Sequence, residues 1–496
     1  MIDRPFLQNF IDLTDQPLTP LIIGTAAAIL AAMIGLSLAL VGPLYTMALL
    51  IALAGAVWVI WRLENAIWAI LAIVALLPFG SLPFKVVITP TFLDLALGAA
   101  LFLYLSQWMF RERRQLVTTP VHVLLILFIL LAIFSFIAGM RYSGLAINVL
   151  RKFAEFVLSM GFALTLVDIL RTPDQLRKVT IVILLTGALA ALLGIGLWVM
   201  PASLAERVIA RLAIVGYPDA GVIQYIEQNP DLGERAIGTS VNPNSLGGFL
   251  VMVAALATPQ LLSRYPITGK RWHIIPILLL LVGCLVLTFS RGSMLAFVAA
   301  LLFIAALRYR RALAILIVIG LILFILPWSQ AYLARFVSGF QGEDLATQMR
   351  FGEYTDALTL VSRYPLFGVG FTGAPDIDIY LGVSSVYLLI AENMGVLGLV
   401  AFLILMAGVI IYGLSARYAV EQIPGLAPIW LGLLAALISA LVNGIGDHYF
   451  FNLEFQHAVL IFWMFIGMIL ASSRIALVHS KEGAGVAPIG ENAILK

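Results

Sequence analysis

Long apolar runs separated by short polar connections dominate this sequence. A run of about 20 apolar residues is long enough to cross the hydrocarbon core of a membrane as a helix. We expect fourteen such spans, at residues 20–42, 43–61, 65–80, 90–109, 121–139, 147–170, 178–200, 243–262, 273–290, 292–308, 311–328, 386–413, 425–445 and 455–474. Because lipid cannot satisfy exposed backbone groups, the pattern predicts an all-α polytopic membrane protein with about 12–14 transmembrane helices.

Composition excludes the main alternative classes. The 496 residues are 62% hydrophobic and 11% charged, whereas an ordinary soluble domain has about 25% charged residues. A net charge of +3 offers no basic surface for nucleic acid. The one cysteine, Cys284, excludes a disulfide framework and a cysteine-based metal site. No spacing of histidines and carboxylates is typical of a metal site, so we expect neither a metal nor a cofactor.

Basic residues predict the orientation, since cytoplasmic loops of membrane proteins are enriched in Lys and Arg. Four basic clusters, at 111–114, 171–178, 264–271 and 308–311, fall on one side when fourteen spans are threaded. The same side receives Arg4, Arg62, Arg417, Arg474, Lys481 and Lys496. We therefore expect both termini to be cytoplasmic, and no cleavable signal at the polar N-terminus.

This topology divides the chain into six parts. They are N-terminal transmembrane helices (1–200), an extracytoplasmic segment (201–242), core transmembrane helices (243–328), a long extracytoplasmic loop (329–385), C-terminal transmembrane helices (386–475) and a cytoplasmic tail (476–496). Long loops are uncommon unless functional. The segments 201–242 and 329–385 both carry apolar residues at helical spacing and should form short amphipathic helices at the outer membrane surface. The residues concerned are Leu204, Val208 and Leu212 in the first, and Met349, Tyr354, Ala357 and Leu360 in the second.

Two polar motifs lie where spans begin on the outer side. In the first, Arg235 precedes an Asn-Pro-Asn turn, with Asn242 as the expected helix cap and Asn244 in the first turn. A helix that begins there offers free N–H groups to an anion. In the second, Ser290 and Arg291 lie between two spans. For either arginine, a role as interfacial anchor or as ion-pair partner is the alternative to ligand binding.

Two further motifs lie near the C-terminus. A glycine-rich stretch at 363–373 precedes a helix at 383–403 that contains Glu392, whose intramembrane carboxylate needs a partner such as an arginine. The outer turn before the last span contains Asp447 and His448. Histidine titrates near neutral pH and can act as a general base, with the aspartate as a candidate to orient its ring. A structural histidine is the alternative.

In this order, over roughly residues 230–475, the motifs resemble the O-antigen ligase/polymerase superfamily of bacterial surface-polysaccharide enzymes. The pieces are R-x-x-G with P-N at 235–244, S-R-G at 290–292, P-L-x-G-x-G at 365–370, and Tyr-Leu followed by E-x-x-G-x-x-G at 387–398. The resemblance implies an inverting, metal-independent glycosyltransferase of the bacterial inner membrane with an extracytoplasmic site. Its expected partners are an undecaprenyl-diphosphate-linked oligosaccharide donor, a glycan or lipid-core acceptor, membrane lipids and other polysaccharide-assembly proteins.

The family usually has His-Asn before that Tyr-Leu, and its histidine is taken as the catalytic base. Here the two positions read Ser384 and Ser385. Three readings stay open: His448 replaces the missing histidine, the acceptor is activated differently, or the activity is changed.

The resemblance and the motif positions together make His448, Arg291 and Arg235 the candidate catalytic residues. The candidate substrate-binding residues are Asn242, Asn244, Ser290, Ser384, Ser385, Tyr387, Glu392 and Asp447. Arginine pairs suit a diphosphate leaving group, because they hold phosphate oxygens in a fork and neutralise developing charge.

Two other functions are compatible with the sequence. A transporter or flippase of lipid-linked oligosaccharide should carry more charges at mid-membrane. Few such charges are found here. Two of them, Arg151 and Glu155, are four residues apart and can pair on one helix face. A protein O-oligosaccharyltransferase would differ only in its acceptor.

Overall fold

The computed structural model describes residues 19–83, 89–142, 144–326, 330, 341, 345–373 and 382–483. Thirteen apolar helices in this part coincide with the fourteen expected spans. They are α2 (Thr19–Trp61), α3 (Leu63–Leu76), α4 (Phe92–Met109), α5 (Val121–Gly139), α6 (Ile147–Ile169), α7 (Pro173–Val199), α9 (Pro243–Leu262), α10 (Ile274–Leu287), α11 (Arg291–Leu307), α12 (Arg310–Ile325), α15 (Val386–Ser415), α16 (Leu426–Asn443) and α17 (Gln456–Gly483). The prediction of an all-α polytopic membrane protein is confirmed.

Within the described residues, seven of these helices are long and apolar enough by themselves to cross a membrane, and five shorter apolar helices accompany them. Short 3-10 helices connect the longer elements. They are η1 (Arg211–Val215), η2 (Ile226–Gln228), η3 (Pro230–Leu232), η4 (Gly238–Ser240), η5 (Arg271–His273) and η6 (Ala419–Gln422).

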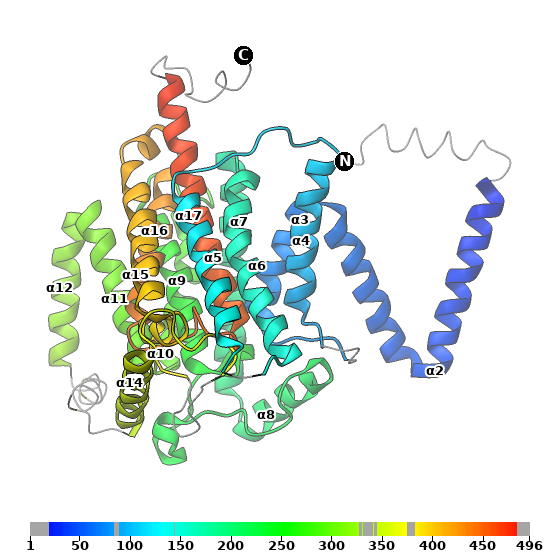
Figure 1. Ribbon diagram of the computed structural model, residues 1–496, viewed down its shortest axis with the longest axis horizontal. Helices are drawn as coiled ribbons and strands as arrows, with labels where there is room; N and C mark the ends of the chain where they lie inside the picture. Colours follow the sequence, from blue (N-terminus) through cyan, green and yellow to red (C-terminus); the bar gives the residue numbers. More distant parts are fainter. Residues whose placement is uncertain are drawn as a thin grey trace. The chain divides into compact units, whose positions relative to one another are not determined.

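The described residues divide after residue 65 into two compact units. In the first, two expected spans are joined in α2, which bends sharply at Gly42 (Figure 1). The φ angle of Gly42 is +82°, a conformation that glycine adopts without steric cost.

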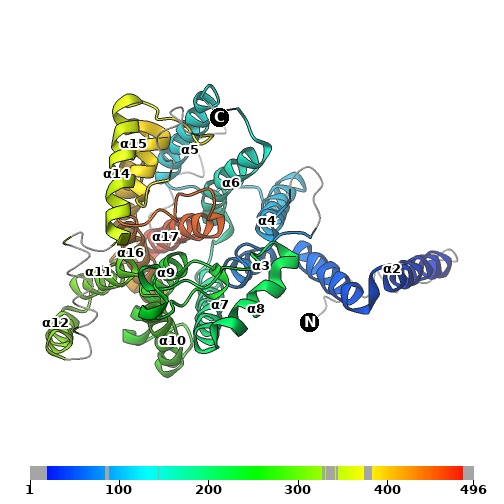
Figure 2. The same ribbon diagram turned by 90° about the horizontal axis from the view of Figure 1, so that it is seen from below.

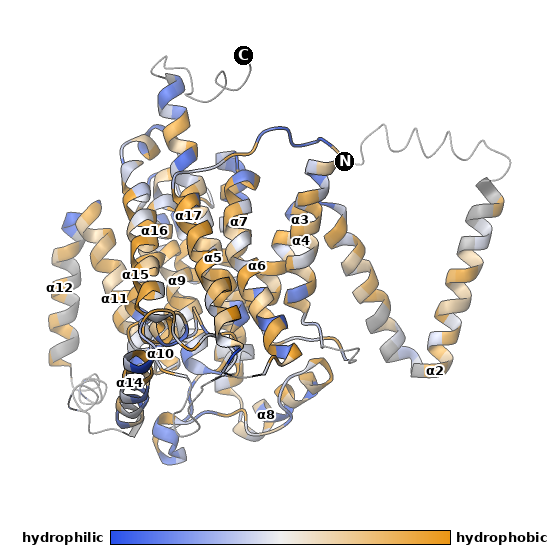
Figure 3. Ribbon diagram, in the orientation of Figure 1, coloured by the Kyte–Doolittle hydropathy of each residue, from blue (hydrophilic) through white to orange (hydrophobic). Residues whose placement is uncertain are grey.

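The second unit is a helix bundle built around α9, α16 and α17 (Figures 1 and 2). In the most apolar stretches of these three helices, 89%, 83% and 94% of the residues are buried, against 39% in α5 and α15. The ribbons of α5 and α15 are nevertheless mostly hydrophobic (Figure 3). Close packing depends on small residues. A Cβ atom on Gly432 would lie 2.7 Å from the carbonyl oxygen of Leu256, so α16 and α9 approach backbone to backbone.

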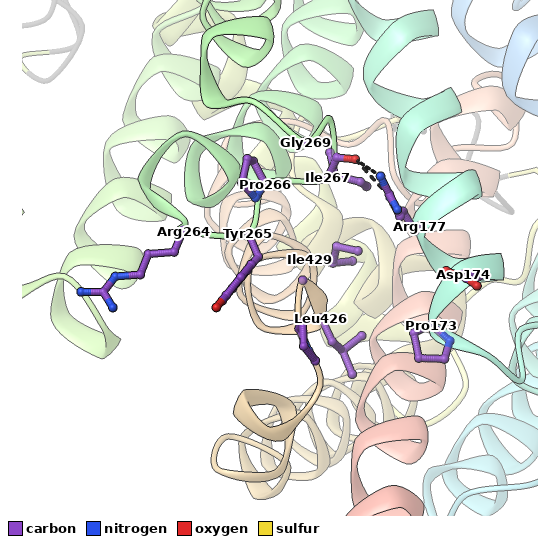
Figure 4. Close-up of a pocket in the computed structure, with 12 residues that line it drawn as sticks. Pro173, Asp174, Arg177, Arg264, Tyr265, Pro266, Ile267, Gly269, Leu426 and Ile429 are labelled. Atoms are coloured by element: carbon purple, nitrogen blue, oxygen red, sulfur yellow. Dashed lines mark hydrogen bonds between the residues drawn. The ribbon is translucent and has the colours of Figure 1, made fainter.

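One end of this bundle collects basic residues. Asp168 is fully buried there and accepts hydrogen bonds from Arg113, from Arg171 and from the hydroxyl of Tyr104. At the same end Arg177 donates to the carbonyl oxygen of Ile267, beside a cavity of about 240 Å³ (Figure 4). Three of the four clusters that the sequence assigned to one side, at 111–114, 171–178 and 264–271, therefore lie together. That this side is cytoplasmic stays a prediction.

The opposite end carries the two amphipathic helices, α8 (Ala202–Ala210) and α14 (Leu345–Arg363) (Figure 1). In α14, Ala357 and Leu360 of the predicted stripe are buried and Tyr354 is partly buried, whereas Met349 is 53% exposed. In α8 the packed face differs from the predicted stripe. Ala205 and Ile209 are buried in a cluster with Leu197 and Tyr217, whereas the predicted Leu204 and Val208 are 40% and 41% exposed.

Candidate functional site

Three helix ends meet at the end of the bundle opposite the basic clusters. Asn242 caps α9 as predicted, and its Oδ1 accepts from the backbone N–H of Asn244 at 2.9 Å. Ser290 caps α11. The hydroxyl of Ser293 in the first turn of α11 donates to Oδ1 of Asn443, the last residue of α16, at 3.2 Å. The capping roles of Asn242 and Ser290 engage their side chains with protein groups, and their part in substrate binding stays a prediction.

Arg235 ties the preceding loop to this junction. Its Nε donates to the carbonyl oxygen of Thr288 at 2.8 Å, and its guanidinium also donates to Oδ1 of Asn244. Because two acceptors hold the guanidinium plane, its position is set before any ligand arrives.

Asp447 is a carboxylate that interacts with the positive charges of Arg350 and Arg235. It is 3% exposed, and its Oδ1 lies 3.7 Å from a guanidinium nitrogen of Arg350 on α14. A Cβ atom on Gly292 would lie 3.5 Å from the other carboxylate oxygen, so Asp447 sits against the first turn of α11, which begins at Arg291. Burial raises the pKa of Asp447 to about 6, although the charges of Arg350 and Arg235 act in the opposite direction.

A cavity of about 280 Å³ adjoins this carboxylate, and we call it the arginine cavity. Two arginines contribute to a wall that is otherwise mostly apolar. The lining residues are Arg291, Gly292, Leu295, Thr347, Arg350, Phe351, Tyr354, Val442, Ile445 and Gly446. The space thus combines positive charge with apolar surface at the end of the spans.

A second cavity of about 370 Å³, which we call the polar cavity, is built from α6, α14, α15 and the turn before α17. Its lining residues are Val149, Lys152, Glu353, Gly370, Phe371, Thr372, Gly373, Gly382, Leu389, Asn393, His448, Phe451, Asn452, Leu453 and Glu454. One turn of α14 contributes to both cavities, since Arg350 lines the arginine cavity and Glu353 lines the polar cavity.

His448 lines the polar cavity, with its ring packed against Tyr449 and Phe455 at centroid distances of 4.7 and 6.0 Å. Its Nδ1 is buried and has no hydrogen-bond partner among the described residues. Asp447 pairs with Arg350 and so does not orient this ring. Burial and the charge of Arg350 lower the pKa of His448 to about 4, so the ring is neutral at physiological pH but only weakly basic.

Ser384 and Ser385 occupy the positions where the family histidine was expected. Here the carboxylate of Glu353 accepts a hydrogen bond from the backbone of Ser384. The N–H of Ser384 donates to Oε2 of Glu353 at 2.9 Å, and the carbonyl oxygen of Ser384 accepts from Tyr354 at 3.3 Å. The hydroxyl of Ser385 donates to the carbonyl oxygen of Gly444 at 3.4 Å. The segment is thereby fastened both to α14 and to the end of α16.

Tyr387 and Glu392 lie deeper in α15. The hydroxyl of Tyr387 donates to the carbonyl oxygen of Leu441 at 2.8 Å, which joins α15 to α16. Glu392 is 1% exposed, and neither carboxylate oxygen has a hydrogen-bond partner among the described residues, so the expected arginine partner is not found there. For both residues a role in substrate binding stays a prediction.

The glycine-rich stretch before α15 serves packing. Gly395 interrupts α15 with a φ of +70°, and a Cβ atom there would lie 2.3 Å from the backbone of Leu366. In turn, a Cβ atom on Gly368 would lie 2.4 Å from the carbonyl oxygen of Glu392. The two backbones can approach this closely only because both positions lack side chains.

Sequence reasoning did not single out several residues of this junction. They are Arg350, Glu353, Asn443 and Tyr449, whose hydroxyl donates to Oδ1 of Asn242 at 3.0 Å, while Tyr354 was predicted only as part of an apolar stripe. The one available signal was the spacing of Arg350, Glu353 and Tyr354, which places them on one helix face.

Comparison with known families supports the resemblance. Residues 276–403, from α10 through α14 to α15, match the family model described as O-antigen ligase. The comparison with curated proteins found no match. The family match confirms the resemblance to the O-antigen ligase/polymerase superfamily and supports a membrane function of this type in polysaccharide assembly.

Proposed function

We propose that this protein is an inverting membrane glycosyltransferase. It transfers a glycan from an undecaprenyl-diphosphate-linked donor to a hydroxyl group of a lipid-linked or lipid-core acceptor, at the extracytoplasmic face of the bacterial inner membrane. The observation that carries the proposal is the arginine cavity, in which Arg291 and Arg350 from two different helices line one space with apolar walls.

The charges of this cavity suit the phosphate part of the donor. A diphosphate leaving group gains negative charge as the glycosidic bond breaks, and fixed guanidinium groups stabilise that charge. Arg291 is the first residue of α11, and the first N–H groups of this helix add positive potential. Asp447 balances Arg350 when no donor is bound. The reaction we propose needs no metal, because the arginines provide the positive charge.

The walls of the cavity suit the lipid part of the donor. Leu295, Phe351, Val442 and Ile445 line it beside the arginines. Leu295 and Phe351 are 43% and 54% exposed, and Ile445 is 61% exposed. Apolar surface next to paired arginines fits the junction between a polyprenyl chain and its diphosphate.

Purified protein in liposomes, supplied with lipid-linked oligosaccharide and an acceptor glycan, tests the proposal. We expect release of the carrier diphosphate together with lengthened glycan. Arg291→Ala and Arg350→Ala should each reduce transfer by about 100-fold or more, the usual effect of removing one such group. Arg207→Ala is the matched control, because Arg207 is exposed on α8 at the same end and donates to the carbonyl oxygen of Ser203 on its own helix.

Three results would overturn the proposal. One is wild-type protein that releases no carrier diphosphate. Another is wild-type turnover in both arginine variants. The third is movement of intact lipid-linked glycan across the bilayer without cleavage, which would identify a transporter.

A further inference from the structure

The polar cavity has the chemical character of a carbohydrate site. Its wall combines groups that donate and accept hydrogen bonds, among them Lys152, Asn393 and Asn452, with the aromatic rings of Phe371 and Phe451. A volume of about 370 Å³ lies within the range of small-molecule sites, which is about 300–1,000 Å³. None of the described residues that line it is an arginine, in contrast to the arginine cavity, and Lys152 is paired with Glu454. It therefore suits a neutral, hydroxyl-rich ligand better than a phosphate.

Glu353 is held in this cavity by a fixed contact. The N–H of Ser384 binds its Oε2, and Tyr354 of the same helix turn fastens the carbonyl oxygen of Ser384. A carboxylate with one oxygen fixed by a backbone donor has a defined position and keeps its other oxygen for a second hydrogen bond.

The spacing on α14 relates this carboxylate to the donor. Arg350 and Glu353 are three residues apart, so their side chains are neighbours on one helix face. One faces the cavity that suits a diphosphate, and the other lines the cavity that suits a sugar. A single helix turn can thus contact both reactants.

Neighbouring groups are less suited to take up a proton. Glu454 also lines the polar cavity, but its carboxylate pairs with Lys152 and is 64% exposed. Protonation of His448 would create a buried cation near Arg350, and its Nδ1 has no partner among the described residues to stabilise that cation. Asp447 lines neither cavity. Glu353 becomes neutral when it accepts a proton, so no new charge is formed.

We propose that the polar cavity binds the acceptor sugar and that Glu353 is the general base for its hydroxyl group. This inference rests on the proposed glycosyl transfer. The acceptor O–H bond breaks and its proton goes to the carboxylate of Glu353, while the oxygen forms a bond to the anomeric carbon of the donor. The bond between that carbon and the diphosphate oxygen breaks, and its electron pair stays on the carrier diphosphate.

The test compares Glu353→Gln, Glu353→Ala and Glu353→Asp in the liposome assay. We expect Glu353→Gln to reduce kcat for transfer by about 100-fold or more, with the donor KM changed less than threefold. Added formate should restore activity to Glu353→Ala, since it supplies a carboxylate to the vacated space, and Glu353→Asp should retain part of the activity. Asp356→Asn is the matched control, because Asp356 lies on the same helix and lines neither cavity.

The outcomes separate this inference from the proposed function. Wild-type protein that transfers no glycan contradicts the proposed function itself. Active wild-type protein with at least half of its kcat left in Glu353→Gln overturns the role of Glu353 alone. So does a folded Glu353→Ala variant that formate fails to reactivate.

Discussion

Asp447→Asn is predicted to gain stability relative to the wild-type protein as the pH rises from 5 to 8, while its activity falls. Asp447 is buried beside Arg350, and burial raises its pKa to about 6 from its ordinary value of 3.8. The folded protein therefore holds this proton more tightly than the unfolded chain does. The folded state loses stability as the pH rises from 3.8 to about 6, because the carboxylate ionises more easily in the unfolded chain.

The size of the effect follows from the shift in pKa. One pKa unit corresponds to about 1.4 kcal/mol, so ionisation of Asp447 costs the folded state about 3 kcal/mol at pH 8 and about half of that at pH 5. Asparagine has a similar shape and no such ionisation. The stability of Asp447→Asn relative to wild type should therefore increase by about 1.5 kcal/mol from pH 5 to pH 8, or on the order of 2 °C in Tm. Any constant effect of losing the pair with Arg350 cancels in this comparison.

Thermal unfolding in detergent, followed by tryptophan fluorescence at pH 5, 6, 7 and 8, measures this difference. Asp219→Asn is the control, since Asp219 is exposed and its substitution should affect stability little. Glycan transfer by Asp447→Asn should fall at least tenfold, because Arg350 loses the carboxylate that positions it. A stability difference that stays constant or shrinks toward pH 8 would refute the reasoning.

Three further predictions concern other parts of the molecule. His448→Ala should lose most of its glycan transfer, because the ring forms part of the wall of the polar cavity. The wild-type pH–rate profile between pH 5 and 8 should show no ionisation near 6.5 that His448→Gln removes, because the pKa of His448 is lowered to about 4. Asp168→Asn should lower the unfolding free energy by about 3 kcal/mol, because two arginines lose a buried carboxylate; a change in Tm below 1 °C in thermal unfolding would contradict this. Gly395→Ala should sharply reduce the yield of monodisperse protein in size-exclusion chromatography, because its φ is +70° and the new Cβ atom meets backbone. Gly196→Ala, with open space at its Cβ position, should match wild type.

Local features of the fold were accessible from the sequence. All fourteen expected apolar segments overlap described helices, because the length and hydropathy that a lipid environment demands are properties of a continuous stretch. The cap of α9 at Asn242 and the ion pair between Arg151 and Glu155 followed from spacing in the same way. The start of α7 was missed, although its signal was present: Thr172 and Gln175 form a capping box around a proline at the first helical position.

By itself, the sequence determined the class of protein, the positions of its helices and the family resemblance. Only the tertiary structure decided that Arg350 faces Asp447, about a hundred residues away, and that Glu353 holds the segment where a histidine was expected. It also decided which face of α8 packs against the bundle. The physical reason is that a helix of given hydropathy can rotate about its axis or shift along it at little local cost. Its orientation is fixed by close contacts such as those of Gly432 and Gly395 with neighbouring backbones, which leave no periodic trace in the chain.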